Sequence, residues 1–403
     1  MDFVLRNALV IDTDPVVVRP GTDVLVSDGR ITAVGKDLVV DRVIDCTDRI
    51  VLPGFVDTHR HLWQVLLRSF TADMSLGEYL EKLLRPVQPV LTPEHLRIGN
   101  LAGALECLAS GITTVQDFSH SPSFAYAEAG VEGLRSSGVR AQFGYGQPLT
   151  RSSVDDVRRA AGLAGGLIDV VLAAPGPSFG GMAEVEEDWA LARSLGQRVV
   201  THIGGDANSI SALRDRGLLD ANMTFVHGNG LSDDELKLIA EAGAGVSIAP
   251  ALEARMGHGA PMVRRTRSLG VLTGLASDTV AAVAGDMFST MRATLLTAQF
   301  SEGVHVTPAD VLRMATIEGA AALGMADRVG SLGVGKHADL VVLRADDINL
   351  VGTADPVAAV VTAAHPGNVE RVFVGGVEAG RQDVAAAVKE AAASLVNALS
   401  PLC

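Results

Sequence analysis

Cysteine and lysine are scarce in this chain of 403 residues, which has three of the former and five of the latter. Scattered cysteines in that number are too few for a disulfide framework or a thiolate metal cluster. No apolar run reaches the roughly 18 residues of a membrane span, and the N-terminal MDFVLR lacks the basic start and apolar stretch of a signal peptide. The formal net charge of −14 argues against nucleic acid, because such binding depends on Lys and Arg neutralising phosphates. We therefore expect a cytoplasmic protein that binds neither nucleic acid nor a membrane.

The two ends of the chain share a β-rich pattern. Near the N-terminus, DVLV at 23–26 and ITAV at 31–34 are typical of strands separated by a turn. The same pattern returns after residue 330, where LVVL follows the turn GKHAD. Two such ends around a different middle predict one small β-sandwich domain assembled from residues 1–52 and 330–380.

The middle of the chain alternates apolar runs with amphipathic stretches. The runs VVTH at 199–202 and MTFVH at 223–227 are short and both end in histidine. Strands that alternate with helices indicate parallel βα units, and about eight such units fit between residues 53 and 325. We therefore predict an α/β fold whose catalytic domain, residues 53–329, is a (β/α)8 TIM-like barrel.

Several helix boundaries can also be predicted. SDDE at 232–235 is a capping box that opens a helix running to Ala242. Thr307 and Pro308 start a later helix that ends near Gly324. The Ala-rich C-terminal segment predicts a last helix, within residues 381–403, packed on the outside of the barrel.

The motif DTHRH carries the strongest chemical signal. On a strand, positions i and i+2 point to the same side, so His59 and His61 can present two imidazoles to one metal ion. By itself the pair is also compatible with two histidines that are neighbours by chance. His202, His227 and Asp278, however, each stand at or just beyond the end of an apolar run. Barrel enzymes place reactive groups at the C-terminal ends of their strands, so we expect all five side chains at one mouth.

These residues stand in segments that resemble the amidohydrolase superfamily, in its branch of cytosine, guanine and triazine deaminases and dechlorinases. The segments are PGFVDTHRH at 53–61, VH at 226–227, ASD at 276–278 and GSLGVGKHADL at 330–340, and the resemblance covers nearly the whole chain. It implies four metal ligands: His59, His61, His202 and Asp278. It also implies that His227 lies over the metal-bound water and the substrate.

The sequence favours one metal ion. Binuclear relatives bridge two ions with a carboxylated lysine from the fourth strand, and the candidate fourth strand at 169–175 contains no lysine. Three imidazoles and a carboxylate suit Zn²⁺ or Fe²⁺, and we expect Zn²⁺. Such an ion lowers the pKa of a bound water. Asp278 could then take the proton of the water while His227 stabilises the developing oxyanion.

One departure from the family pattern concerns the acid that protonates the leaving nitrogen. Relatives that release ammonia usually carry Glu three residues after the equivalent of His202, whereas this chain has Gly205 there and Asp206 one residue later. Either Asp206 or another acid serves as the catalytic acid, or the reaction differs.

Three functions therefore stay open at this point. The first is hydrolysis at a C–N carbon of a small aromatic or heterocyclic substrate. The second is cyclisation of an ortho-aminophenol ester or amide to a benzoxazole-type ring, which needs no acid for ammonia release. The third is a metal-containing protein that binds a small molecule without catalysis.

Candidate substrate contacts follow the strand ends. Side chains near those ends predict an aromatic and Met-lined cleft for a flat, small substrate, with Trp63 on the face of the two histidines if the strand stays extended. The candidates are Trp63, Gln64, Phe118, His120, Glu253 and Met287. We also expect a homo-oligomer.

Overall fold

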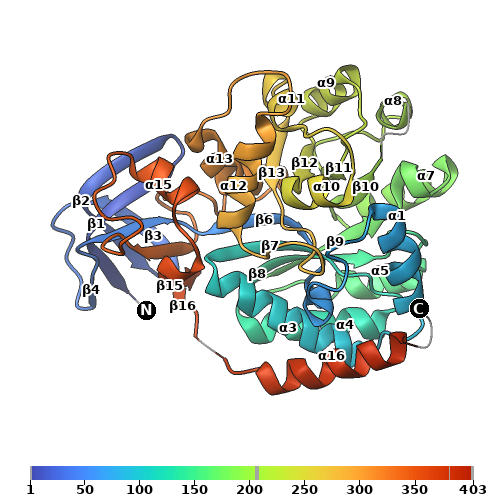
Figure 1. Cartoon of the computed structure of the whole chain (residues 1–403), viewed down its shortest axis with the longest axis horizontal. Coiled ribbons are helices and arrows are strands. Elements are labelled where there is room, and N and C mark those ends of the chain that lie inside the picture. The colour runs from blue at the N-terminus through green and yellow to red at the C-terminus, as the bar shows by residue number, and fades with distance from the viewer. Residues whose placement is uncertain (1, 205–207, 381, 401–403) are drawn as a thin grey trace.

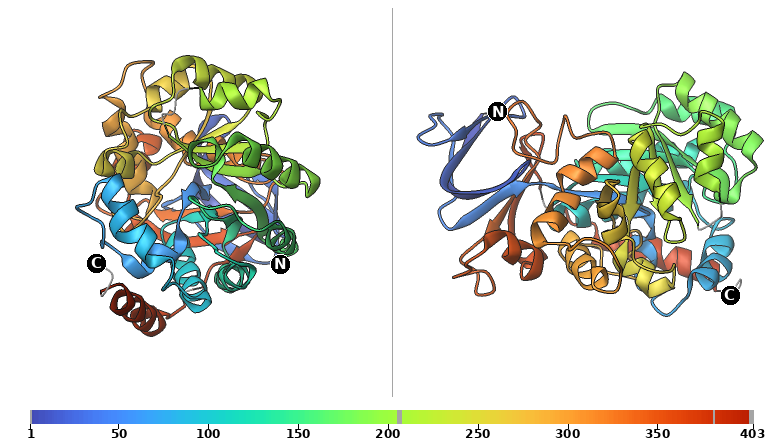
Figure 2. Two further views of the ribbon diagram at one scale, coloured as in Figure 1. Left: turned by 90° about the vertical axis from the view of Figure 1, so that its right-hand side faces the viewer. Right: turned by 90° about the horizontal axis from the view of Figure 1, so that it is seen from above.

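A computed structural model describes residues 2–204, 208–380 and 382–400 and places them in two sheets surrounded by helices (Figure 1). One sheet contains eight parallel strands and forms a nearly closed barrel, and the other is built from both ends of the chain. In the views of Figures 1 and 2 the second sheet stands at one end of the barrel. The predicted fold class, a (β/α)8 barrel with a small β-domain from both termini, is confirmed.

The barrel strands follow one another in chain order around the sheet, and most of their residues are buried, as expected for parallel strands covered by helices. They are β6 (Phe55–Arg60), β7 (Ile112–Phe118), β8 (Arg140–Gly146), β9 (Ile168–Ala174), β10 (Val199–Ile203), β11 (Met223–His227), β12 (Gly245–Ile248) and β13 (Leu272–Leu275). The first and last strands meet just beyond β13, where the Asp278 amide donates to the His59 carbonyl and the His61 amide donates to the Asp278 carbonyl. This closure brings Asp278 against the histidine motif.

The second sheet has the strand order β16-β15-β14-β5-β1-β2-β3, with β4 beside β1. Its strands are β1 (Phe3–Thr13), β2 (Val16–Ser27), β3 (Arg30–Gly35), β4 (Val43–Asp45), β5 (Arg49–Pro53), β14 (Leu340–Arg344), β15 (Val369–Val374) and β16 (Val377–Glu378). The antiparallel pairing of β5 with β14 joins the two ends of the chain. The rings of Phe3 and Phe373 stack 5.0 Å apart in the core of this sheet.

The helices lie mainly around the barrel. In chain order they are η1 (Leu62–Leu67), α1 (Leu76–Tyr79), η2 (Leu80–Leu84), α2 (Arg85–Val87), α3 (Pro93–Ala109), α4 (Phe124–Ser137), α5 (Val154–Ala161), α6 (Gly176–Phe179), α7 (Met182–Ser194), α8 (Ser209–Asp215), α9 (Asp233–Ala242), α10 (Pro250–Met256), α11 (Val263–Ser268), α12 (Met287–Ala298), α13 (Pro308–Met314), α14 (Ile317–Ala322), α15 (Pro356–Thr362), η3 (Pro366–Asn368) and α16 (Ala385–Leu399). Helix α9 has the predicted capping box and ends at Ala242.

The single helix predicted from Thr307 to Gly324 is wrong, because the structure contains two helices there, α13 and α14. The break lies at Thr316, whose backbone (φ −136°, ψ −100°) is not helical. Beside it, the carbonyl of Ala315 accepts a hydrogen bond from the amide of Val56 at 2.9 Å. The backbone between α13 and α14 is therefore hydrogen-bonded to β6, the first barrel strand.

The C-terminal helix α16 lies on the outside of the barrel, beneath α3 in Figure 1, and contacts α3 and η1. Its Leu395 and Leu399 are buried. In the described part of the chain we find no helix that is both long and apolar enough to cross a membrane.

Candidate active site

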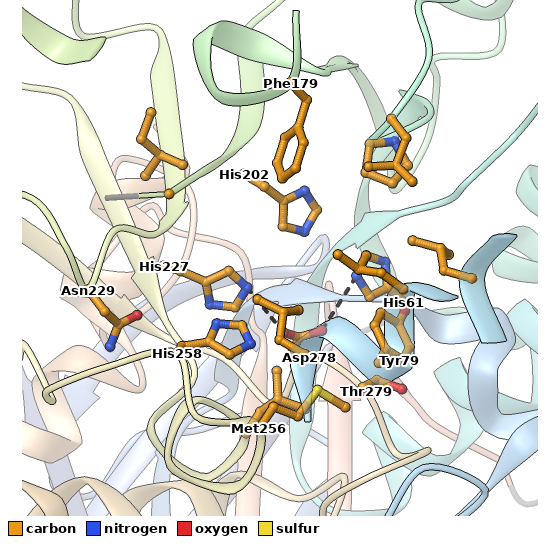
Figure 3. Close-up of a pocket in the computed structure, with 18 of the residues that line it drawn as sticks. His61, Tyr79, Phe179, His202, His227, Asn229, Met256, His258, Asp278 and Thr279 are labelled. Carbon is orange, nitrogen blue, oxygen red and sulfur yellow. Dashed lines mark ion pairs between the residues drawn. The ribbon is translucent and has the colours of Figure 1, made fainter. Parts of the chain in front are cut away.

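Five side chains meet at the C-terminal mouth of the barrel, and Figure 3 shows four of them, His61, His202, His227 and Asp278. They come from the ends of four strands: His59 from β6 and His61 from just after it, His202 from β10, His227 from β11 and Asp278 from just after β13. Between the first two histidines, Arg60 points away and pairs with Glu106 on α3 at 2.5 Å. This alternation along the strand leaves both imidazoles on the side of the mouth.

The Asp278 carboxylate lies at the centre of this group. Its Oδ1 is 3.7 Å from His59 Nε2 and 3.4 Å from His61 Nε2. Its Oδ2 is 3.4 Å from His227 Nε2. Ligand atoms of His59, His61 and His202 also lie within 4.8 Å of one another. The structure thus brings together five of the residues singled out in the sequence.

The histidines are oriented by partners behind them. His61 Nδ1 lies 2.8 Å from the carbonyl oxygen of Phe118, and His59 Nδ1 lies 3.4 Å from Gln116 Oε1. Hydrogen bonds of this kind fix the ring and leave Nε2 for a metal. Burial and the neighbouring imidazoles hold the pKa of His59 and of His202 well below the usual range, which favours the neutral form that metals bind.

A divalent cation fits this group. His59 Nε2 and His202 Nδ1 are buried, and neither atom has a hydrogen-bond partner in the described part of the chain. Unpartnered polar atoms in a protein interior are rare, and a bound ion is one way to satisfy them. Imidazoles with one carboxylate are the donors that zinc takes in catalytic sites.

Three residues at the barrel mouth have left-handed backbone conformations. They are His120 (φ 53°), His227 (φ 68°) and Asp278 (φ 61°), which lie at or just beyond the ends of β7, β11 and β13. Residues other than glycine rarely adopt this region unless the surroundings enforce it. The backbone therefore turns sharply where each of these side chains enters the site.

A cavity of about 250 Å³ opens above the five side chains. Apart from the histidines and Asp278, its wall is largely apolar and comes from loops that follow several strands (Figure 3). Its lining residues are His61, Leu76, Tyr79, Leu80, Leu84, His120, Pro148, Leu149, Phe179, His202, Ile203, Gly204, His227, Asn229, Gly230, Leu252, Met256, His258, Asp278 and Thr279.

Of the six predicted substrate contacts, His120 lies in this lining, and its ring centroid is 4.2 Å from that of His61. The other five are not among the residues that line the cavity. Phe118 is fully buried, with its ring 4.6 Å from that of His202. Trp63 is also fully buried, because the chain does not stay extended after His61 but turns into the 3-10 helix η1.

Of the remaining three candidates, two form hydrogen bonds with residues that line the cavity, and the third lies in the core. Gln64 donates to the Tyr79 hydroxyl at 2.7 Å and accepts from the Thr279 hydroxyl, so it holds two lining side chains. Glu253 accepts a hydrogen bond from His227 Nδ1 at 3.1 Å. Met287 is fully buried in the hydrophobic core, where α12 packs on the barrel. Asp206, the candidate acid, lies outside the described residues.

Sequence reasoning missed most of the apolar wall. Leu76, Leu80 and Leu84 recur every four residues, a spacing that places them on one helical face and could have indicated a common surface. Phe179 carries no comparable signal, because it stands alone at the end of the short helix α6.

A (β/α)8 barrel whose mouth gathers imidazoles and a carboxylate around a small cavity is the architecture of a metal-dependent hydrolase. The model of the amidohydrolase family matches residues 50–379, and the chain belongs to this family.

Named relatives are deaminases. The chain is 32% identical to a 5-methylthioadenosine/S-adenosylhomocysteine deaminase of Symbiobacterium thermophilum, over 93% of this chain and 94% of the relative. It is 31% identical to the enzyme of the same name from Desulforudis audaxviator, over 93% of each chain. These relatives hydrolyse C–N bonds outside peptides, and this protein is a hydrolase of that kind.

Solved structures agree with the fold. An adenosine deaminase from Xanthomonas campestris with bound zinc superposes with a TM-score of 0.89 at 25% identity, covering 99% of both chains. An atrazine chlorohydrolase from Arthrobacter aurescens in complex with zinc gives 0.85 at 23% identity, covering 98% of this chain and 100% of that one, a likeness of fold alone. None of the proteins named here is a cyclase or a non-catalytic binder, so these two alternatives gain no support.

Proposed function

We propose that the protein is a deaminase that replaces an exocyclic amino group of a small nitrogen heterocycle by oxygen and releases ammonia. The observation that carries the proposal is the convergence of three imidazoles on the Asp278 carboxylate, with a fourth, His202, beside His59 and His61, beneath a largely apolar cavity. Similarity over more than nine-tenths of the chain to named deaminases supports this reaction over other hydrolyses.

His59, His61, His202 and Asp278 would hold one divalent ion, with Zn²⁺ the best match to the donors. The absence of lysine from β9, the fourth barrel strand, favours a single ion. When bound, the ion supplies Lewis acidity that makes water a nucleophile near neutral pH.

The protein groups then account for binding and proton movement. A C–O bond forms between water and the ring carbon, the exocyclic C–N bond breaks, and the two water protons end on the leaving nitrogen and the product. Asp278 would accept the first proton. With a proton on Nε2 as well as on Nδ1, His227, whose Nε2 is 3.4 Å from that carboxylate, would stabilise the negative charge that develops on the oxygen.

The cavity wall favours a substrate with an uncharged, apolar substituent. Leu76, Leu80, Leu149, Phe179 and Met256 line it, whereas several polar lining groups are already engaged. A thioether or alkyl group fits this wall, but a charged tail buried there without a partner would be strongly disfavoured.

The test is ammonia release by zinc-loaded protein from adenosine, 5′-methylthioadenosine, S-adenosylhomocysteine, an aminotriazine and cytosine. We expect turnover of at least one purine substrate, with the thioether compound preferred over the one with the amino-acid tail, and loss of turnover after chelation. If no substrate of the panel releases ammonia at full zinc occupancy, the proposed function is wrong.

A further inference from the structure

The residue behind His227 is a buried carboxylate. Glu253 is 3% exposed and lies on α10, just after the seventh barrel strand. Its Oε1 accepts from His227 Nδ1 at 3.1 Å and from the Ala249 amide at 2.8 Å. Its Oε2 accepts from Asn229 Nδ2 at 3.1 Å. Both carboxylate oxygens are therefore engaged, and Glu253 is not among the residues that line the cavity.

This arrangement leaves one nitrogen of His227 for the reaction. Because Nδ1 points at Glu253, the Nε2 atom faces Asp278 and the cavity (Figure 3). A neutral imidazole can carry its hydrogen on either nitrogen, and the hydrogen bond made by one nitrogen decides the state of the other. A carboxylate can only accept from Nδ1.

The backbone of His227 leaves the regular strand geometry. Its φ of 68° and that of Gly228, 91°, place the end of β11 in the left-handed region, so the ring is not fixed by a regular strand geometry. Asn229 strengthens the support, because its Nδ2 donates both to Glu253 and to the Ala260 carbonyl at 3.1 Å. The ring centroid of His258 also lies 4.5 Å from that of His227.

We propose that Glu253 is the positioning residue of His227, which fixes the hydrogen on Nδ1 and so presents Nε2 to the substrate and to Asp278. Its role is thus different from the substrate contact expected from the sequence. The turnover measurements below rest on the proposed function, whereas the tautomer measurement does not.

The first experiment is nitrogen NMR of zinc-loaded protein labelled with ¹⁵N-histidine, in which the signals of His227 are assigned by their loss in His227→Gln. We expect hydrogen on Nδ1 in the wild-type protein and a shift of the hydrogen towards Nε2 in Glu253→Ala. An unchanged tautomer in Glu253→Ala would overturn the proposal, whether or not a substrate is known.

The second experiment compares turnover. Glu253→Ala should lower kcat on the order of 10²-fold and change KM less than about threefold, since a misoriented catalytic group affects the transition state more than binding. The matched control is Glu235→Ala, which removes another buried carboxylate, one that caps α9 and is not among the lining residues. If both variants lose turnover equally at equal zinc content, Glu253 has a merely structural role.

A conservative variant separates orientation from charge and guards against misfolding of Glu253→Ala. In Glu253→Gln the Ala249 amide still requires an acceptor, so the amide oxygen takes the place of Oε1 and keeps the hydrogen on Nδ1. The amide nitrogen then faces Asn229, whose Oδ1 is buried without a partner among the described residues. This oxygen can accept from the Gln side chain once the Asn229 amide turns over, which costs the hydrogen bond of Nδ2 to the Ala260 carbonyl.

We expect Glu253→Gln to retain kcat within about tenfold of the wild type. A loss as large as that of Glu253→Ala would show that the charge, not the tautomer, matters and would overturn the proposal. If the wild-type protein deaminates nothing, the proposed function fails and the NMR result alone decides this inference.

Discussion

Removal of the metal should destabilise the barrel by a predictable amount. A ligand that binds the folded chain at 1,000 times its dissociation constant adds about 4.1 kcal/mol to the free energy of unfolding. With an unfolding entropy of about 2.1 cal/mol/K per residue, a chain of 403 residues unfolds with about 0.85 kcal/mol/K. The quotient predicts that chelation lowers Tm by about 5 °C. We expect the metal bond of His59 to provide much of this stabilisation, because His59 is fully buried and its Nε2 lacks a partner among the described residues.

The assay is differential scanning calorimetry of the chelated protein over a titration with Zn²⁺, together with elemental analysis. The wild type should regain its Tm at close to one equivalent, and His59→Ala should show no zinc-dependent rise. The control is His305→Ala, which alters a histidine outside the group of five and should leave the zinc response intact. A second tightly bound equivalent would refute the mononuclear site, and a normal zinc response in His59→Ala would refute the proposed ligand set.

Three other parts of the molecule can be tested by single changes. Phe179 lies at the cavity wall and is 46% exposed, so Phe179→Ala should lower Tm little. In steady-state assays its KM for a flat substrate should rise about tenfold, because a stacking surface is lost. An unchanged KM would show that Phe179 does not contact the substrate. Deletion of residues 1–50 removes β1 to β4 and the first two residues of β5, so β5 loses β1, one of its two partner strands. The truncated chain should therefore be insoluble on expression, and a soluble, active product would contradict this view of the β-domain. Asp206→Asn should slow ammonia release roughly tenfold to a hundredfold if Asp206 protonates the leaving nitrogen; near-wild-type kinetics at equal zinc content would mean that another group supplies the proton.

The sequence predicted best what is set by strand geometry. His59 and His61 are two positions apart on a strand, and His202, His227 and Asp278 each end an apolar run, so the barrel topology brings them together. The apolar wall could not be predicted in the same way. Its residues come from loops of different lengths and short helices, and which side chain reaches the cavity depends on packing rather than on a periodic pattern.

Trp63 and Met287 were predicted as substrate contacts but do not reach the cavity. Both come soon after residues of the barrel mouth, His61 and Asp278, and have side chains suited to a binding cleft, yet both are fully buried. The chain turns into η1 after His61, and α12 directs Met287 into the core. Proximity in sequence to a reactive residue therefore says little about access to the cavity once the strand has ended.

The left-handed residues at the mouth explain why the reactive groups lie where regular strands stop. Such a conformation costs of order 1 kcal/mol or more for a residue with a Cβ atom, and His120, His227 and Asp278 each adopt it. At Asp278, backbone hydrogen bonds to His59 and His61 hold the turn in place, while the Glu253 carboxylate holds the side chain at His227. The hydrogen bonds of the barrel closure and of the buried Glu253 carboxylate thus offset the conformational cost of these left-handed residues, whose side chains point into the mouth. A bound metal would offset this cost further, because it would join Asp278 to the histidines of the first and fifth strands.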